Sequence, residues 1–286
     1  MLLTIPIAAA RILDLIFFTD WITGYFIEGS VYIRVAVALV VVFLGYFTGF
    51  VRRRSIKEFE YDIESTNSSI ERLSIAGGVC FFLAGVANAA ASVAVFYTLY
   101  TSGEISYIKR SSEELLSIGK SKLYYVLLLA SIVLGVLAAF WFMLVGSWYF
   151  RGEGHFSGGR YLSIVVVVWF YVRIIKDFLE FPINPNNSTS LVLIISTLFL
   201  ALFYSKFAKV ISTDFPLIDD PSQFSYGGVA FIWVVAVAAP TIIVLIDKNR
   251  IAQVVSTSAD IISAIAALST LFAKLPGRKQ EEDIVL

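Results

Sequence analysis

Six long stretches of this sequence contain almost no charged residue, and each nearly reaches or exceeds the length needed to cross a lipid bilayer. A spanning helix needs about 20 mainly apolar residues, because within lipid every backbone N–H and C=O must find its partner inside the segment. The sequence therefore predicts an all-α, polytopic integral membrane bundle of six or seven transmembrane helices with an additional interfacial N-terminal helix. The six stretches are Val35–Val51, Leu73–Gly103, Leu123–Phe150, Tyr161–Val172 with its continuation, Leu191–Ser205 and Pro221–Ile246.

The composition supports a membrane protein and argues against nucleic acid as a partner. Hydrophobic residues make up 58% of the 286 residues and charged residues only 15%, whereas soluble domains have roughly 45–50% and 25%. The 22 basic and 22 acidic residues cancel, so the chain lacks the basic excess typical of nucleic-acid binding. We expect a multi-pass protein, most simply of the cell membrane, whose partners are the lipid bilayer and either other membrane protein subunits or a second copy of itself.

The hydrophilic connections are too short to fold independently, so the chain is predicted to form one membrane domain with two flanking segments. Residues 1–30 form an amphipathic or interfacial N-terminal segment, residues 31–275 the transmembrane helical domain, and residues 276–286 a polar C-terminal tail. Arg11, Asp14 and Asp20 favour the interfacial interpretation of the N-terminal segment over a tilted span. Each such charge costs roughly 2.5–3.5 kcal/mol at the centre of a membrane helix.

The last apolar segment, Ile251–Leu275, has a helical period with one polar stripe. Such a helix either lies in the membrane interface or spans with its polar face toward protein or water. If it spans, the number of transmembrane helices becomes seven. The residues of the polar stripe are Gln253, Thr257, Asp260, Ser263, Thr270 and Lys274.

Charged groups inside apolar segments are the best candidates for a functional site, because burial in lipid requires a partner or water. Arg173, Lys176, Asp177 and Glu180 follow the spacing i, i+3, i+4, i+7, so they share one helix face and can pair along it. They either belong to an ion or substrate path or cap the helix at the headgroups. Asp260 lies in mid-segment, and we expect it to face the protein interior or water rather than lipid.

Small and polar residues mark expected contacts between helices. Gly45 and Gly49 have the GxxxG spacing, and Ala84, Asn88 and Ser92 repeat every four residues. Such faces let two helix backbones approach closely, and Asn88 can donate a hydrogen bond to a neighbouring helix. We therefore include Asn88 among the candidate residues for a polar path or a partner contact.

The tryptophans are predicted to lie in belts at the membrane interface, where indole rings are enriched. The chain contains Trp21, Trp141, Trp148, Trp169 and Trp233.

No motif in the sequence supports a catalytic, cofactor or metal site. A thiolate nucleophile at the single cysteine, Cys80, would need a base, and the single histidine is His155. We interpret both as structural. No cofactor and no metal is expected, and enzyme activity is not expected, although the sequence leaves that question open.

Two functional classes fit these features. The first is a transport-type or channel-type membrane subunit that works with partners and whose polar residues line a path. The alternative is a non-catalytic scaffold or assembly subunit of a larger membrane complex.

Overall fold

The computed structural model describes residues 4–20, 27, 34, 36–47, 67–109, 122–151, 156, 160–180, 188–212 and 221–270. Helices account for nearly all of these residues, and the described part of the chain contains no β-strand. The all-α prediction is therefore confirmed there. The predicted C-terminal tail, residues 276–286, lies outside the described residues.

The helices are long, and most correspond to the apolar stretches of the sequence. They are α1 (Thr4–Phe17), α3 (Asn67–Thr101), η2 (Glu104–Lys109), α5 (Lys122–Arg151), α6 (Arg160–Glu180), α7 (Ser188–Ser212), α8 (Pro221–Ile232), η3 (Trp233–Ala238), α9 (Thr241–Asp247) and α10 (Ile251–Ser269). A further helical segment covers Ala36–Phe47. With 35 residues, α3 is about 52 Å long, so it exceeds the roughly 30 Å of a bilayer's hydrocarbon core.

Four of the described helices are long and apolar enough to cross a membrane, within α3, α5, α7 and α10. A fifth span exists if α8 with η3 and α9, which meet at a bend of 43°, together count as one. Two predicted spans do not meet these criteria among the described residues. Ala36–Phe47 is short, and α6 has 21 residues but carries a cluster of charges in its C-terminal half. The predicted total of six or seven stays a prediction.

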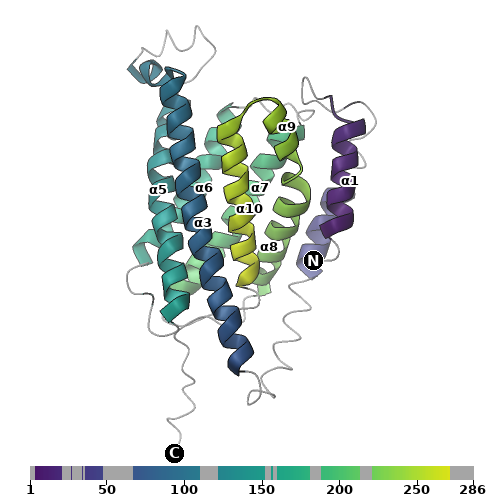
Figure 1. The fold of residues 1–286 in the computed structure, drawn as a ribbon, viewed down its shortest axis with the longest axis vertical. Helices are drawn as coiled ribbons and strands as arrows, with labels where there is room; N and C mark the ends of the chain where they lie inside the picture. The colour runs from purple at the N-terminus through teal and green to yellow at the C-terminus, as the bar shows by residue number, and fades with distance from the viewer. Residues whose placement is uncertain are drawn as a thin grey trace, which may run out of the picture.

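The contacts between the six main helices form a closed ring. Each of α3, α5, α6, α7 and α8 packs against the next along the chain, and α10 closes the ring by packing against both α3 and α8. In Figure 1, α10 stands between α3 and α8, and α1 lies at the outer edge beside α8. This order places α10 where several helices can reach it with side chains.

Aromatic side chains fill the centre of the ring. Trp141 and Phe142 of α5, Phe170 of α6, and Tyr204 and Phe207 of α7 are fully buried. Neighbouring rings pack face to face or edge to face, for example Phe142 against Tyr204 with centroids 5.0 Å apart. Such aromatic packing stabilises beyond the burial of area alone. The core is therefore built mainly from large rings contributed by successive helices.

Two short turns allow the helices to reverse direction. Gly103 ends α3 with a φ of 72°, a left-handed conformation that glycine adopts without strain. Asn249 has a φ of 51° between α9 and α10, and asparagine is among the side chains that best tolerate that conformation. The turn at Asn249 lets α10 begin at Ile251 and return along the bundle.

The bend between α8 and α9 has an identifiable cause. Residues Trp233–Ala238 form π-helix, and Ala239 N–H donates to the carbonyl of Val234, five residues earlier. Pro240 follows directly and cannot donate a backbone hydrogen bond. A π-bulge next to a proline is a usual origin of a sharp helix kink.

The N-terminal segment packs on the outside of this bent element. Helix α1 lies against η3, and its Ile7 and Ala8 pack on an apolar cluster that includes Val41, Trp233 and Val237. Gly45 meets α8 so closely that an added Cβ would lie 2.7 Å from the Cα of Val229. Gly45 therefore serves packing within the chain, whereas Gly49 lies outside the described residues.

Candidate functional site

The centre of the candidate site is an ion pair between α6 and α10. Arg173 donates from Nη1 to Asp260 Oδ1 at 2.7 Å and from Nη2 to Asp260 Oδ2 at 2.8 Å. This is the bidentate arrangement in which the planar guanidinium matches both carboxylate oxygens. Asp260 is buried and only 4% exposed, and the side chain of Arg173 is 11% exposed. The sequence singled out both residues without indicating that they meet.

Two further contacts hold the Arg173 guanidinium. Its Nη2 also donates to Ser256 Oγ at 3.2 Å, and its Cζ lies 5.0 Å from the ring centroid of Trp169. Trp169 in turn donates from its indole N–H to the carbonyl of Ser131 on α5 at 3.2 Å. A cation over an indole face is attracted by the ring quadrupole. The guanidinium is therefore positioned from α6 and α10, and through Trp169 indirectly from α5.

The pair lies far from either end of α10. Asp260 is nine positions from Ile251 and nine from Ser269, which places it about 13 Å along the helix from each end. Because α10 is one of the helices able to cross a membrane, this position puts the pair near the centre of a candidate span. Ionisable groups at such depth are rare and usually pair within the bundle interior.

A second set of polar contacts reaches α10 at Ser263. Asn88 of α3 donates from Nδ2 to Ser263 Oγ at 2.9 Å and also to the carbonyl of Ala84. Tyr204 of α7 donates its hydroxyl to the carbonyl of Ser263 at 2.7 Å. All three residues are buried. Helix α10 is thus connected through polar side chains to α3, α6 and α7.

The other candidates on α6 form a separate network. Lys176 Nζ lies 2.7 Å from Asp177 Oδ1 and 3.8 Å from Glu180 Oε2. The four charges therefore divide: Arg173 pairs across the bundle with Asp260, whereas Lys176, Asp177 and Glu180 pair along the last turns of α6. The latter arrangement is compatible with the helix-cap interpretation.

The polar stripe of the last apolar segment faces the protein. Thr257, Asp260 and Ser263 are buried against neighbouring helices, while Ile265 on the other side is exposed. Lys274 lies outside the described residues. The sequence left open whether the stripe faces the membrane interface, protein or water, and in the structure these three residues pack against protein.

The tryptophans are placed differently from the belts expected from the sequence. Trp141, Trp148, Trp169 and Trp233 are all at most 7% exposed and pack inside the bundle, so the belt prediction is wrong for these four. Trp141 donates to Ser163 Oγ at 2.9 Å, and Trp233 donates to the carbonyl of Val192. Their N–H groups find partners inside the protein, which removes the need for an aqueous interface. Trp21 lies outside the described residues.

Sequence reasoning missed Tyr204 and Trp169 as parts of the site. Both lie within apolar runs in which nothing separates an interior aromatic residue from one that faces lipid. Position gave no signal either, because Tyr204 is the penultimate residue of the Leu191–Ser205 run and Trp169 lies three positions before Val172.

The described residues include few other side chains suited to catalysis or metal binding. Cys80 is partly buried beside the aromatic core, and His155 lies outside the described residues. Among the side chains that the structure describes, no group of three or more His, Cys, Asp or Glu residues is arranged to hold a metal ion.

The geometry allows the pair to act as a two-state contact. In the observed state Asp260 satisfies Arg173 with both oxygens. If a proton or a cation occupied Asp260, that attraction would weaken, and the guanidinium would keep its contacts with Ser256 and the Trp169 ring. A change of ligand at one carboxylate could thereby alter how α6 holds α10.

Comparison with known proteins found no matching protein family, no matching curated protein and no matching solved structure.

Proposed function

We propose that the chain is a multi-pass, six- or seven-span subunit of the cell membrane, of the transport or channel type. The observation that carries the proposal is the buried Arg173–Asp260 pair midway along α10. A buried ion pair is weak as a stabilising device, since a well-packed apolar pair of similar volume is often as stable. A charged pair at this depth is better explained if its charges take part in binding or moving an ion.

The surrounding features support the same proposal. Asn88, Ser263 and Tyr204 add polar groups to the interior face of α10. The bent element formed by α8, η3 and α9 packs against that helix, and interrupted helices are common where transporters form a site. In this proposal, a proton or small cation competes with Arg173 for Asp260, and partner subunits or a second copy complete the assembly.

The test is flux through liposomes that contain the purified full-length chain. Uptake of H⁺, Na⁺ and K⁺ is measured with ion-sensitive dyes under an imposed membrane potential. We expect flux of at least one cation above empty liposomes, reduced several-fold in Asp260→Asn, whose amide keeps a hydrogen-bond acceptor for Arg173. The matched control is Asp247→Asn, because Asp247 is exposed at the end of α9.

Absence of flux for all three cations, with folded protein in the liposomes, would count against the proposal. Identical flux in the wild-type chain and Asp260→Asn would show that the pair is not part of the path. If flux is absent and Asp260→Asn instead loses membrane proteins that copurify with the wild-type chain, the scaffold alternative is favoured.

A further inference from the structure

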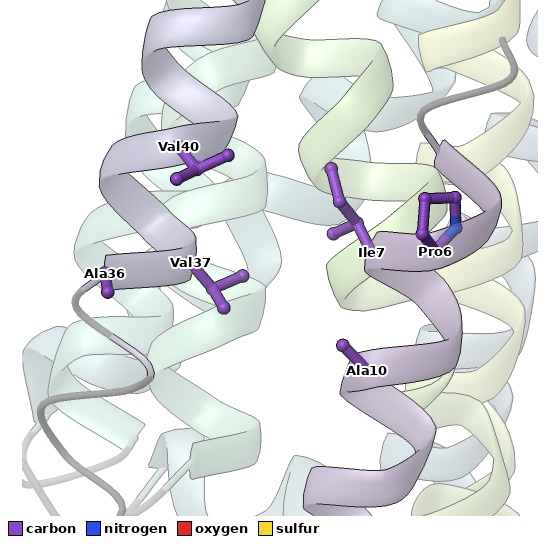
Figure 2. A pocket seen from close by; sticks show the side chains of 6 residues that line it. All are labelled: Pro6, Ile7, Ala10, Ala36, Val37 and Val40. Carbon is purple, nitrogen blue, oxygen red and sulfur yellow. The ribbon is translucent and has the colours of Figure 1, made fainter.

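A groove separates α1 from the helical segment Ala36–Phe47 on the outer side of the bundle. It has a volume of about 380 Å³, which falls within the roughly 300–1,000 Å³ of typical ligand sites. Figure 2 shows side chains of both helices on either side of it. The groove has an almost wholly apolar lining made of Pro6, Ile7, Ala10, Ala36, Val37 and Val40.

A charged cluster lies beside this groove. Arg34 precedes Val37 by three residues and donates from Nε to Asp14 Oδ2 at 3.1 Å. Arg11 directly follows Ala10, lies one helical turn beyond Ile7, and donates from Nη1 to the same carboxylate. Arg11 and Asp14 of α1 and Arg34, which precedes the second helical segment, therefore form an ion cluster about one turn from the lining residues.

Arg11 has an unused edge that fits an oxyanion. The residue is only 6% exposed, and its Nε and Nη2 have no hydrogen-bond partner in the structure. These two N–H groups point the same way on the guanidinium and form its side-on fork, which matches two oxygens of one carboxylate or phosphate. Buried donors without a partner cost free energy that an anionic ligand would recover.

We propose that this groove binds an anionic phospholipid, with one acyl chain along the apolar lining and the phosphate on the Nε/Nη2 fork of Arg11. Charge complementarity selects the occupant, because an apolar groove beside an unsatisfied guanidinium edge matches an amphiphile with a negative head. Both nitrogens are buried, so the atoms around them must move to admit the phosphate. The site is independent of the Arg173–Asp260 pair.

The test compares single-chain lipids that differ only in the headgroup. The purified full-length chain in a neutral detergent is titrated with lauroyl lysophosphatidylglycerol, lauroyl lysophosphatidylcholine or glycerol phosphate, and binding is followed by the shift in melting temperature. We expect the phosphatidylglycerol form to bind at least about tenfold more tightly than the phosphatidylcholine form, equivalent to about 1.4 kcal/mol. Glycerol phosphate, which has the head without the tail, should produce no shift.

Variants separate the head and tail contributions. Arg11→Gln and Arg11→Lys should both lose the preference for the anionic lipid, since neither keeps the fork. Ala10→Phe, which fills the groove, should weaken both lipids alike. Arg151→Gln is the control, because Arg151 is exposed at the end of α5, and it should bind as the wild-type chain does.

The comparison of the three ligands on the wild-type chain decides the question even if a variant does not fold. Equal affinity for the two lipids would overturn the role of Arg11. An equal shift with glycerol phosphate would show a free phosphate site and overturn the role of the groove.

Discussion

At the residue scale, the main question is what the Arg173–Asp260 contact contributes to the fold. Removing two charges from water is costly, and their attraction compensates only with near-ideal geometry and additional hydrogen bonds. Here the bidentate contact, Ser256 and the Trp169 ring supply both. The pair is therefore stable when intact, and either charge left alone would be strongly unfavourable.

Loss of one charge should destabilise the protein more than loss of both. Asp260→Leu leaves the Arg173 guanidinium buried without a counter-ion, and removal of one partner of such a pair costs about 3–5 kcal/mol. The double variant Arg173→Met with Asp260→Leu should recover most of that loss. The measurement is the apparent melting temperature in detergent. Equal melting temperatures of the wild type and Asp260→Leu would show that the pair does not hold the bundle together.

The hydroxyl of Tyr204 offers a second test at this scale. Tyr204→Phe removes the donor to the Ser263 carbonyl and leaves a buried acceptor with one hydrogen bond fewer. We expect a loss of about 1–3 kcal/mol in the free energy of unfolding. Tyr97→Phe is the control, because Tyr97 is 65% exposed on α3. A similar small effect for both variants would contradict the importance of this contact.

At the element scale, α3 and α5 approach each other closely. A Cβ added at Gly146 would lie 2.8 Å from the carbonyl oxygen of Gly78 and 2.9 Å from the backbone nitrogen of Phe82. A Cβ at Gly85 would lie 2.8 Å from the carbonyl oxygen of Ala139. Because these neighbours are backbone atoms, they cannot rotate away. Close approach of small residues is a usual way for membrane helices to associate.

Gly146→Ala should therefore destabilise the protein, although alanine is normally the better helix former by about 1 kcal/mol. The added methyl group must push α3 away from α5. The measurement is the melting temperature, together with the fraction of monodisperse protein after purification. Val136→Ala, at an exposed position of α5, serves as the control. A rise in melting temperature for Gly146→Ala would mean that the two helices are not this close.

At the scale of the whole molecule, the direction of the helices predicts which ends share a membrane face. Helix α3 is continuous over its 35 residues, and α5 packs along it in the opposite direction (Figure 1). Ser102 follows the end of α3, and Arg151 ends α5 at the opposite end of the bundle. The two positions should lie on opposite faces of a membrane.

Cysteine labelling in cells tests this arrangement. Ser102→Cys and Arg151→Cys are introduced singly into a Cys80→Ala background, and both positions are exposed. An impermeant thiol reagent added outside should label one of the two, and the other only after the membrane is permeabilised. Labelling of both from the same side would rule out the predicted crossing.

The sequence alone determined that the chain is helical and apolar enough for a membrane, and it identified Asp260 and Arg173 as unusual. The reason is local: segment length and charge depth are properties of consecutive residues, and a charge within an apolar helix requires a partner wherever that helix lies.

Only the tertiary structure decided which partner each group has. Arg173 and Asp260 are 87 residues apart, and they meet because α10 turns back at Asn249 and closes the ring. The tryptophans show the same limit. Lipid tails and a protein core are both apolar, so an aromatic residue in an apolar run fits either environment. Packing against neighbouring helices places Trp141 and Trp169 inside, and no pattern of consecutive residues carries that information.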